Sequence, residues 1–179
     1  MQYQSEEEFA KLVERFKRLT PCSRVLEIGS LIGDTLRVWM ALMETPGTIV
    51  TVDVIVGPDD GRHRQQKDGH QIHWPRMARN LGLEFYAMND DSTNGVTVAN
   101  VKSILPVVDF LLIDGGHDYN TVKSDWENYG PMVREGGLVA FHDIGMPDVR
   151  RVWDMAKKRA KSEEIVEKPG ELGIGVIFK

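Results

Sequence analysis

The chain is poor in cysteine, has no excess of basic charge and contains no long apolar run. Its one cysteine, Cys22, excludes an intramolecular disulfide and fits a reducing compartment. With 27 acidic and 22 basic residues the net charge is −5, so the overall basic footprint of a nonspecific nucleic-acid binder is missing. We therefore expect no nucleic-acid partner.

We also expect neither a signal peptide nor a membrane span in this sequence. No run approaches the ~20 apolar residues that a membrane span requires. Residues 1–8 are acidic and lack the apolar h-region of a signal peptide. There is no internal repeat and no low-complexity segment. We expect a cytoplasmic protein that does not engage a membrane.

What is present is enough for one α/β domain over 1–179, with 41% hydrophobic residues. Apolar residues recur at helical spacing within 1–20, after Ser5 as the expected N-cap, and predict an amphipathic helix. The one compositional break is 57–71, a polar loop of a length typical of lids and binding loops. Neither segment carries a readable specificity code.

Downstream of residue 20, short β-rich runs alternate with helical patterns. Strands are predicted at 25–28, 48–54, 83–88, 107–113, 138–141, 164–168 and 173–178, and helices at 33–44, 74–81, 94–104, 119–133 and 148–161.

This alternation predicts a Rossmann-like, doubly wound α/β fold with a seven-stranded, mostly parallel sheet. The last two strands are joined only by 169–171, and a parallel pair would need a long crossover. The sequence therefore predicts a C-terminal antiparallel hairpin, which a plain dinucleotide fold does not have.

The loop after the first strand is the first candidate binding element, because ligands bind at the carboxyl ends of strands in such sheets. Its glycines, Gly29 and Gly33, follow G-x-x-x-G spacing and not the dinucleotide G-x-G-x-x-G pattern. A carboxylate at Glu27 suits the ammonium end of an amino-acid-bearing cofactor, with Ser30 nearby. The alternative is an ordinary helix-starting turn with a surface acid.

Two further strand ends supply partners for this loop. Asp53 ends the second strand, where a carboxylate can accept hydrogen bonds from both ribose hydroxyls. The third strand is followed by Asp90, Asp91 and Ser92, which we expect to face an adenine. The alternative reading of this cluster is a helix N-cap, at Ser92 or Asn94.

The fourth and fifth strands end in Asp114 and Asp143, which should be neighbours at the same edge. Together they predict a site for a hard divalent cation such as Mg²⁺. His142 would favour Mn²⁺ as a third ligand. Strand alternation points it away from Asp143, so we rank it below the aspartates.

His117 follows Asp114 by three residues and suits a general base near neutral pH. The alternative is that His117 and Tyr119 only order their loop. Some other polar residues are not expected to do chemistry: a zinc site is disfavoured for His63, His70 and His73, which lack a ligand pattern, and Asp125 and Trp126 are expected to support the fold.

Residues 112–119, Leu-Ile-Asp-Gly-Gly-His-Asp-Tyr, are followed by Val122, Asp125, Trp126, Gly136–Gly137 and Phe141-His142-Asp143. This pattern resembles the methyltransferase-24 type family, related to macrocin O-methyltransferase and the cephalosporin hydroxylases. The resemblance covers about 22–178. Catechol O-methyltransferase is a more distantly similar architecture. It has a lysine at the position of His117 and an Asp-Asn pair at His142-Asp143.

The resemblance implies methyl transfer from S-adenosylmethionine to an oxygen of a sugar or small natural product. With the aspartate pair, we expect Mg²⁺ or Mn²⁺ to assist transfer to a hydroxyl of a small-molecule acceptor. From the residues themselves we predict Asp114 and His117 as the catalytic residues, and Asp114, Asp143 and His142 as the metal ligands. The cofactor residues are Glu27, Gly29, Ser30, Gly33, Asp53, Asp90, Asp91, Ser92 and Asp114.

Three questions stay open on the sequence. One alternative function is an NAD(P)-dependent Rossmann oxidoreductase, which the missing G-x-G-x-x-G and the hairpin disfavour. Another is a noncatalytic binding module that keeps the cofactor fold. The edge strands and the helix within 1–20 are compatible with a homo-oligomer.

Overall fold

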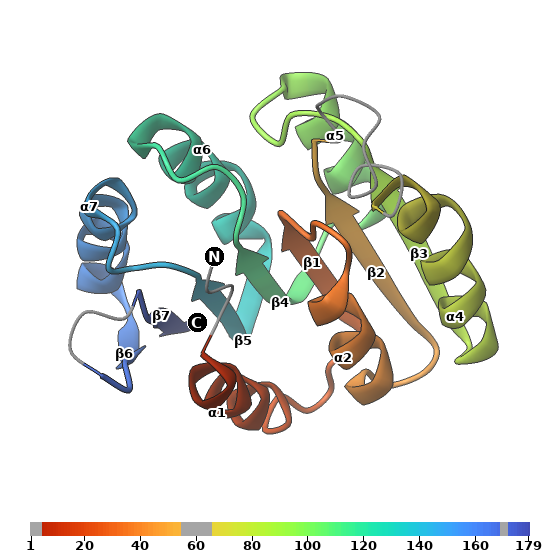
Figure 1. The fold of residues 1–179 in the computed structure, drawn as a ribbon, viewed down its shortest axis with the longest axis horizontal. Coiled ribbons are helices and arrows are strands. Elements are labelled where there is room, and N and C mark those ends of the chain that lie inside the picture. The colour runs from red at the N-terminus through yellow and green to blue at the C-terminus, as the bar shows by residue number, and fades with distance from the viewer. Residues whose placement is uncertain (1–4, 55–65, 169–171) are drawn as a thin grey trace.

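A computed structural model describes residues 5–54, 66–168 and 172–179. Its middle layer is one seven-stranded sheet of order β3-β2-β1-β4-β5-β7-β6 (Figure 1). The strands are β1 Arg24–Ile28, β2 Gly47–Val52, β3 Leu83–Met88, β4 Val108–Ile113, β5 Val133–Phe141, β6 Lys161–Ile165 and β7 Ile174–Phe178.

The pairing confirms the expected fold. β1 lies between β2 and β4 and is parallel to both, and β5 continues the parallel set. β7 is antiparallel to both β5 and β6, so the chain ends in the expected hairpin. All five parallel strands therefore point their carboxyl ends to one edge of the sheet.

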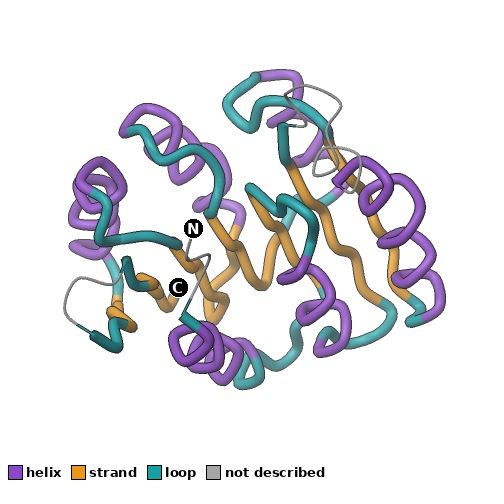
Figure 2. Tube along the Cα trace, in the orientation of Figure 1, coloured by secondary structure: helices purple, strands orange, loops and turns teal. Residues whose placement is uncertain are grey.

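Helices cover both faces of the sheet (Figure 2). One face packs against α1, α2 and α4, and the other against α5, α6 and α7. The helices are α1 Glu6–Phe16, α2 Asp34–Leu42, the π-helix η1 Gly69–His73, α4 Trp74–Asn80, α5 Gly95–Ile104, α6 Tyr119–Tyr129, α7 Pro147–Ala156, and the 3-10 turns η2 Gly130–Met132 and η3 Lys157–Arg159.

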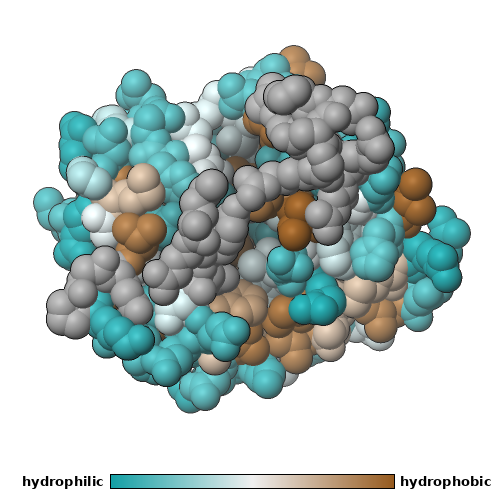
Figure 3. Space-filling model, viewed as in Figure 1, coloured by the Kyte–Doolittle hydropathy of each residue, from teal (hydrophilic) through white to brown (hydrophobic). Residues whose placement is uncertain are grey.

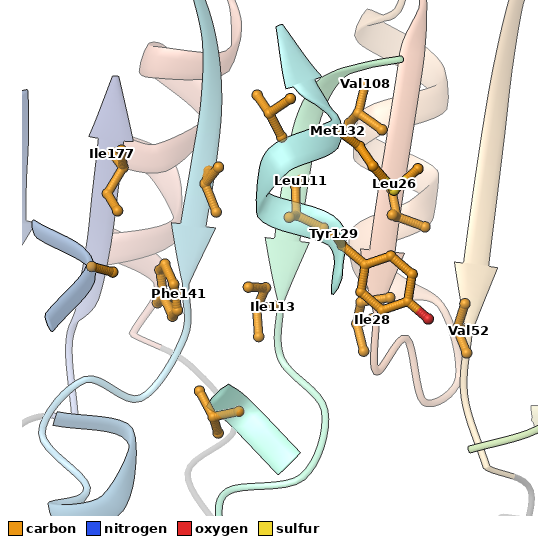
Figure 4. Close-up of a cluster of buried hydrophobic side chains, with 14 of the residues drawn as sticks. Leu26, Ile28, Val52, Val108, Leu111, Ile113, Tyr129, Met132, Phe141 and Ile177 are labelled. Carbon is orange, nitrogen blue, oxygen red and sulfur yellow. The ribbon is translucent and has the colours of Figure 1, made fainter. Parts of the chain in front are cut away.

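The core follows strand alternation. Leu26 and Ile28 of β1 point to the face covered by α5–α7, together with Leu111 and Ile113 of β4 (Figure 4). Tyr129 of α6 reaches into this cluster and is fully buried. Burial of each large side chain stabilises the fold by about 1.5–3 kcal/mol. This packing fixes the level at which each strand ends.

One buried carboxylate ties the amino ends of three strands together. Asp109 accepts hydrogen bonds from the backbone amide of Arg24 at 2.9 Å and from its guanidinium at 2.8 Å. Arg134 of β5 donates to the same side chain at 2.6 Å. Burial raises the pKa of Asp109, but these hydrogen bonds outweigh it and hold the pKa below the usual value.

Two of the predicted boundaries around β5 are wrong. The helix predicted over 119–133 ends at Tyr129, because Pro131 has no amide hydrogen to continue it. β5 then begins at Val133, not at residue 138. It passes Gly136 at φ +76°, where its register with β4 shifts. The stretch left between the predicted helix 119–133 and the predicted strand 138–141 is thus a bulge within β5.

Four other predictions also need correction. The helix predicted over 148–161 gives way to η3, and β6 starts at Lys161, three residues before the predicted 164–168. This edge strand has the sequence Lys-Ser-Glu-Glu-Ile, so it lacks the alternation of apolar and polar residues by which a strand is predicted. The predicted loop 57–71 is helical from residue 66, and 57–65 lies outside the described residues. Ser5 is the N-cap of α1, but its side chain makes no capping hydrogen bond.

The described surface is mostly hydrophilic on the face shown in Figure 3, and its hydrophobic side chains form small separate groups. The exposed large hydrophobic residues include Ile72 and Val96, which come from different elements. No helix within the described ranges is both long and apolar enough to cross a membrane.

Candidate active site

A cleft of about 630 Å³ lies at the carboxyl edge of the parallel strands. It is the place where the sequence predicts ligand binding. The lining residues come from the ends of β1 to β5 and the loops after them: Ile28, Gly29, Leu31, Val52, Asp53, Val54, Asp90, Asp91, Ser92, Asp114, Gly115, Gly116, His117, Thr121, His142 and Asp143. Of the predicted site residues, only Glu27, Ser30 and Gly33 are outside this lining.

The loop after β1, residues 29–33, is called the first loop. Its surroundings require glycine at both Gly29 and Gly33. Gly29 has φ +84°, and a Cβ there would overlap the carbonyl oxygen of Asp114. Gly33 has φ +89°, and a Cβ there would overlap the indole of Trp74. Glycine alone adopts such backbone angles without strain. The first loop is thus pressed against the loop after β4 and against α4.

Glu27 is buried behind the cleft. Its carboxylate accepts hydrogen bonds from Thr35 Oγ1 at 2.5 Å and from Trp39 Nε1 at 2.8 Å, both on α2. Burial raises the pKa of Glu27 to about 8, against the effect of these two donors. Strand alternation explains the placement, because the neighbouring Ile28 lines the cleft. In this structure Glu27 holds α2 against β1, and its contact with an ammonium group stays a prediction.

Asp53 reaches the cleft from the end of β2. It accepts a hydrogen bond from the backbone amide of Leu31 at 2.5 Å, which joins it to the first loop. Burial raises the pKa of Asp53, opposed by that amide. The carboxylate therefore lies where the sequence predicts a ribose-binding group.

The loop after β3 is held by its own side chains. Asp90 accepts from Thr97 Oγ1 at 2.7 Å, and Asp91 accepts from the amide and hydroxyl of Thr93. Asn94 caps α5 by accepting from the amide of residue 96, which decides between Ser92 and Asn94 as the cap. Ser92 is therefore left to line the cleft beside the two aspartates.

Two histidines and two aspartates meet on the opposite wall. His142 Nδ1 lies 2.9 Å from Asp143 Oδ1 and 3.2 Å from Asp114 Oδ1. His117 Nε2 lies 3.0 Å from Asp143 Oδ2. The expectation that His142 points away from Asp143 is wrong, because Asp143 lies beyond the end of β5 with φ +57°. That turn of the backbone brings both side chains into the cleft.

In this group the carboxylates stabilise the charged form of the imidazoles, and the imidazoles stabilise the charged form of Asp143. Burial lowers the pKa of His142, but the two carboxylates outweigh burial and raise it to about 10. The hydrogen bond to Asp143 raises the pKa of His117. Burial raises the pKa of Asp143, and the two imidazoles outweigh it and hold this pKa far below the usual value.

The donor set fits a divalent cation. One ligand atom each from Asp114, His117 and Asp143 lie within 4.8 Å of one another. Two carboxylates with one imidazole suit Mg²⁺ or Mn²⁺. The predicted pair of aspartates is therefore brought together, and His142 pairs with both of them.

The sequence did not indicate which residues cover the first loop, although His70 belongs to the predicted polar loop 57–71. His70 of η1 is buried, with Nε2 3.0 Å from Ser30 Oγ. Trp74 Nε1 donates to the carbonyl of Ile32 at 3.2 Å. No spacing rule marks these residues, and the only signal was the clustering of polar residues in 57–71.

Comparison with protein families identifies the chain. A family model described as a methyltransferase domain matches residues 26–144. The chain belongs to this family. The match includes the first loop, the loop after β3 and the strand ends that carry Asp114 and Asp143. The resemblance drawn from the motifs at 112–119 and 141–143 is confirmed.

Solved structures share the fold of this methyltransferase domain. The O-methyltransferase from Bacillus cereus in complex with SAH matches with TM-score 0.65 and 16% identity, over 99% of this chain and 83% of that one. CalS11, a TDP-rhamnose 3'-O-methyltransferase of calicheamicin biosynthesis, matches with TM-score 0.65 and 15% identity, over 99% and 81%.

MycE, a methyltransferase of the mycinamycin pathway in complex with Mg, SAH and mycinamycin VI, matches with TM-score 0.63 and 16% identity, over 99% of this chain and 50% of that one. Among curated proteins, Uncharacterized protein y4gI from Sinorhizobium fredii (strain NBRC 101917 / NGR234) is 35% identical over 75 residues. That match spans 40% of this chain and 8% of the relative.

Proposed function

We propose that this methyltransferase domain transfers a methyl group from S-adenosylmethionine to a hydroxyl oxygen of a small molecule, such as a sugar, with Mg²⁺ or Mn²⁺ assisting. One observation carries the proposal: a single cleft has Asp53 and Ser92 on one wall and Asp114, His117 and Asp143 on the other. The hydrogen-bonding groups of the first wall suit a nucleoside. The carboxylates and the imidazole of the second wall suit a hydroxyl group that loses its proton. Two of the similar structures support this choice: MycE is a complex with Mg, SAH and mycinamycin VI, and CalS11 is a TDP-rhamnose 3'-O-methyltransferase.

On the cofactor wall, each group has a defined task. Asp53 accepts hydrogen bonds from the ribose hydroxyls. Gly29, without a side chain, lets the ligand approach the backbone of the first loop. Asp91 and Ser92 lie at the next strand end and accept from the exocyclic amine of adenine. Asp114, which adjoins Gly29, lies where the two walls meet.

On the acceptor wall, Asp114 and Asp143 would hold the divalent cation, and His142, which pairs with both aspartates, would be the third ligand and leave His117 free as the base. When bound, the cation lowers the pKa of the acceptor hydroxyl. His117 takes the proton of that hydroxyl, since its side chain is 38% exposed and opens to the cleft. The acceptor oxygen forms the new bond to the methyl carbon while the sulfur–methyl bond breaks with its electron pair on sulfur. Alignment of the two reactants supplies much of the rate.

Titration calorimetry tests the cofactor. We expect the protein to bind S-adenosylhomocysteine and not NAD, whereas an oxidoreductase would show the reverse. Mass spectrometry of any nucleoside that copurifies with the protein provides an independent check.

Turnover tests the chemistry, with panels of hydroxyl-bearing acceptors in Mg²⁺, Mn²⁺ or chelator. We expect Asp114→Ala and chelation each to abolish methylation. Turnover that survives both would refute the metal-assisted step. Cofactor binding without turnover on broad panels would favour a noncatalytic binding module.

A further inference from the structure

His70 is a buried histidine that does not line the cleft, yet it contacts two of the loops that form it. It is 2% exposed and lies on the π-helix η1. Its Nε2 is 3.0 Å from Ser30 Oγ, in the loop after β1. Its Nδ1 is 3.3 Å from Asn89 Oδ1, in the loop after β3. One imidazole therefore bridges two loops whose strands are separated in the sheet by β2.

The partners of the imidazole determine where its proton lies. The carbonyl oxygen of Asn89 can only accept, so Nδ1 carries the hydrogen. Thr51 Oγ1 donates to Ser30 Oγ at 2.7 Å, so the hydroxyl hydrogen of Ser30 is directed at Nε2. The Nδ1–H tautomer of His70 satisfies every bond of this network.

The same segment supports the first loop at a second place. Trp74, next to η1, donates from Nε1 to the carbonyl of Ile32, and its indole fills the space beside Gly33. The first loop is thus held at Ser30 and at Ile32 by one stretch of chain. A π-helical turn is uncommon and is found frequently at functional sites.

We propose that His70 is a positioning residue of the cofactor site. It sets the separation between the loop after β1 and the loop after β3, between which the nucleoside of the cofactor lies. The inference rests on the proposed function, because it assigns His70 to the binding of that cofactor. The network reaches the nucleoside through the loops and needs no contact between His70 and the ligand.

Calorimetry with S-adenosylhomocysteine tests the proposal, with thermal unfolding of each ligand-free variant measured alongside. His70→Phe removes both bonds, and we expect about tenfold weaker binding by folded protein, since one buried hydrogen bond corresponds to about that factor. His70→Gln keeps an acceptor for Ser30 and His70→Asn keeps a donor for Asn89, so each should recover part of the loss. His73→Phe is the matched control, because His73 lies on the same π-helix and is exposed.

Two further readouts separate positioning from a purely structural role. Ser30→Ala and His70→Phe break the same contact, so their effects on cofactor affinity should not add. In ligand-free protein, ¹⁵N NMR of the imidazole should report the Nδ1–H tautomer. Folded His70→Phe that binds as tightly as the wild type, or an Nε2–H tautomer, would overturn this inference alone. Wild-type protein that does not bind S-adenosylhomocysteine would instead overturn the proposed function and this inference with it.

Discussion

The Nε2 atom of His117 lies 3.0 Å from Oδ2 of Asp143, at the point where the loops after β4 and β5 meet. This pair links the proposed base to a proposed metal ligand. Its strength determines the pH at which His117 is neutral and able to accept a proton.

Replacing Asp143 should therefore shift the titration of His117 in metal-free protein. Asp143 raises the pKa of His117 above its usual 6.5, so Asp143→Asn should lower the midpoint. The pair stabilises the fold below the unfolded pKa and loses this effect as pH rises through the folded pKa. NMR titration, which follows the Cε1 signal of His117 in the presence of chelator, measures this midpoint in the wild type and in Asp143→Asn. Asp148→Asn is the control. A midpoint that does not move would contradict the pairing.

Metal binding should depend on Asp114 and Asp143. Each Asp→Ala change removes an oxygen ligand from a partly buried site, and we expect Mn²⁺ affinity to fall at least about a hundredfold. Calorimetry or Mn²⁺ electron paramagnetic resonance measures the affinity. Asp148→Ala removes an exposed carboxylate of α7 and should leave it unchanged. Equal affinities in all four proteins would place the cation elsewhere.

Gly29→Ala should be far more damaging than Gly95→Ala. At Gly29 the new Cβ meets the Asp114 carbonyl at positive φ, with an expected cost of about 2 kcal/mol or more. At Gly95, the first residue of α5, a Cβ meets nothing within 4 Å, and alanine should be neutral or stabilise by up to about 1 kcal/mol. Urea unfolding measures both. Similar stabilities would show that the loop can relax away from Asp114.

Trp39→Phe should destabilise the protein more than Trp153→Phe. Both indoles are fully buried and donate at 2.8 Å, Trp39 to buried Glu27 and Trp153 to half-exposed Glu164. Losing a donor to a buried carboxylate costs about 1–3 kcal/mol. We expect a smaller cost for Trp153→Phe, where water can replace the donor.

The pH dependence of the Trp39→Phe effect follows from Glu27. Burial raises its pKa to about 8, so ionisation of Glu27 lowers stability as pH rises from about 4.5 through 8. The Trp39 bond opposes this loss, so the difference between Trp39→Phe and wild type should widen between pH 6 and pH 9. Urea unfolding at pH 6 and at pH 9 measures this difference in the free energy of unfolding. A difference that is the same at both pH values would argue against ionisation of Glu27 in this range.

Much of the fold could be predicted because the strands are visible in the sequence as short runs rich in apolar and β-branched residues. β4 is buried along its whole length and reads as one apolar run, and β3 lies where the sequence predicts it. Once strand order follows from alternation, Asp114 and Asp143 must be neighbours. Predicting that these two aspartates lie together thus required only that two parallel strands end side by side.

The remainder depends on contacts that sequence spacing does not encode. The position of β6 follows from its pairing with β7, and only Ile165 of that strand is buried. His142 enters the cleft through the backbone angle of Asp143, a non-glycine residue at positive φ. The role of His70 depends on two loops that are 40 and 19 residues away in the chain.

The close approach of Gly29 to the carbonyl of Asp114 has a consequence for redesign. The two walls of the cleft share one backbone contact, so neither can be rebuilt as an independent module. Engineering that seeks a new methyl acceptor should vary positions away from this junction, such as Thr121, and keep residues 29 and 114 fixed.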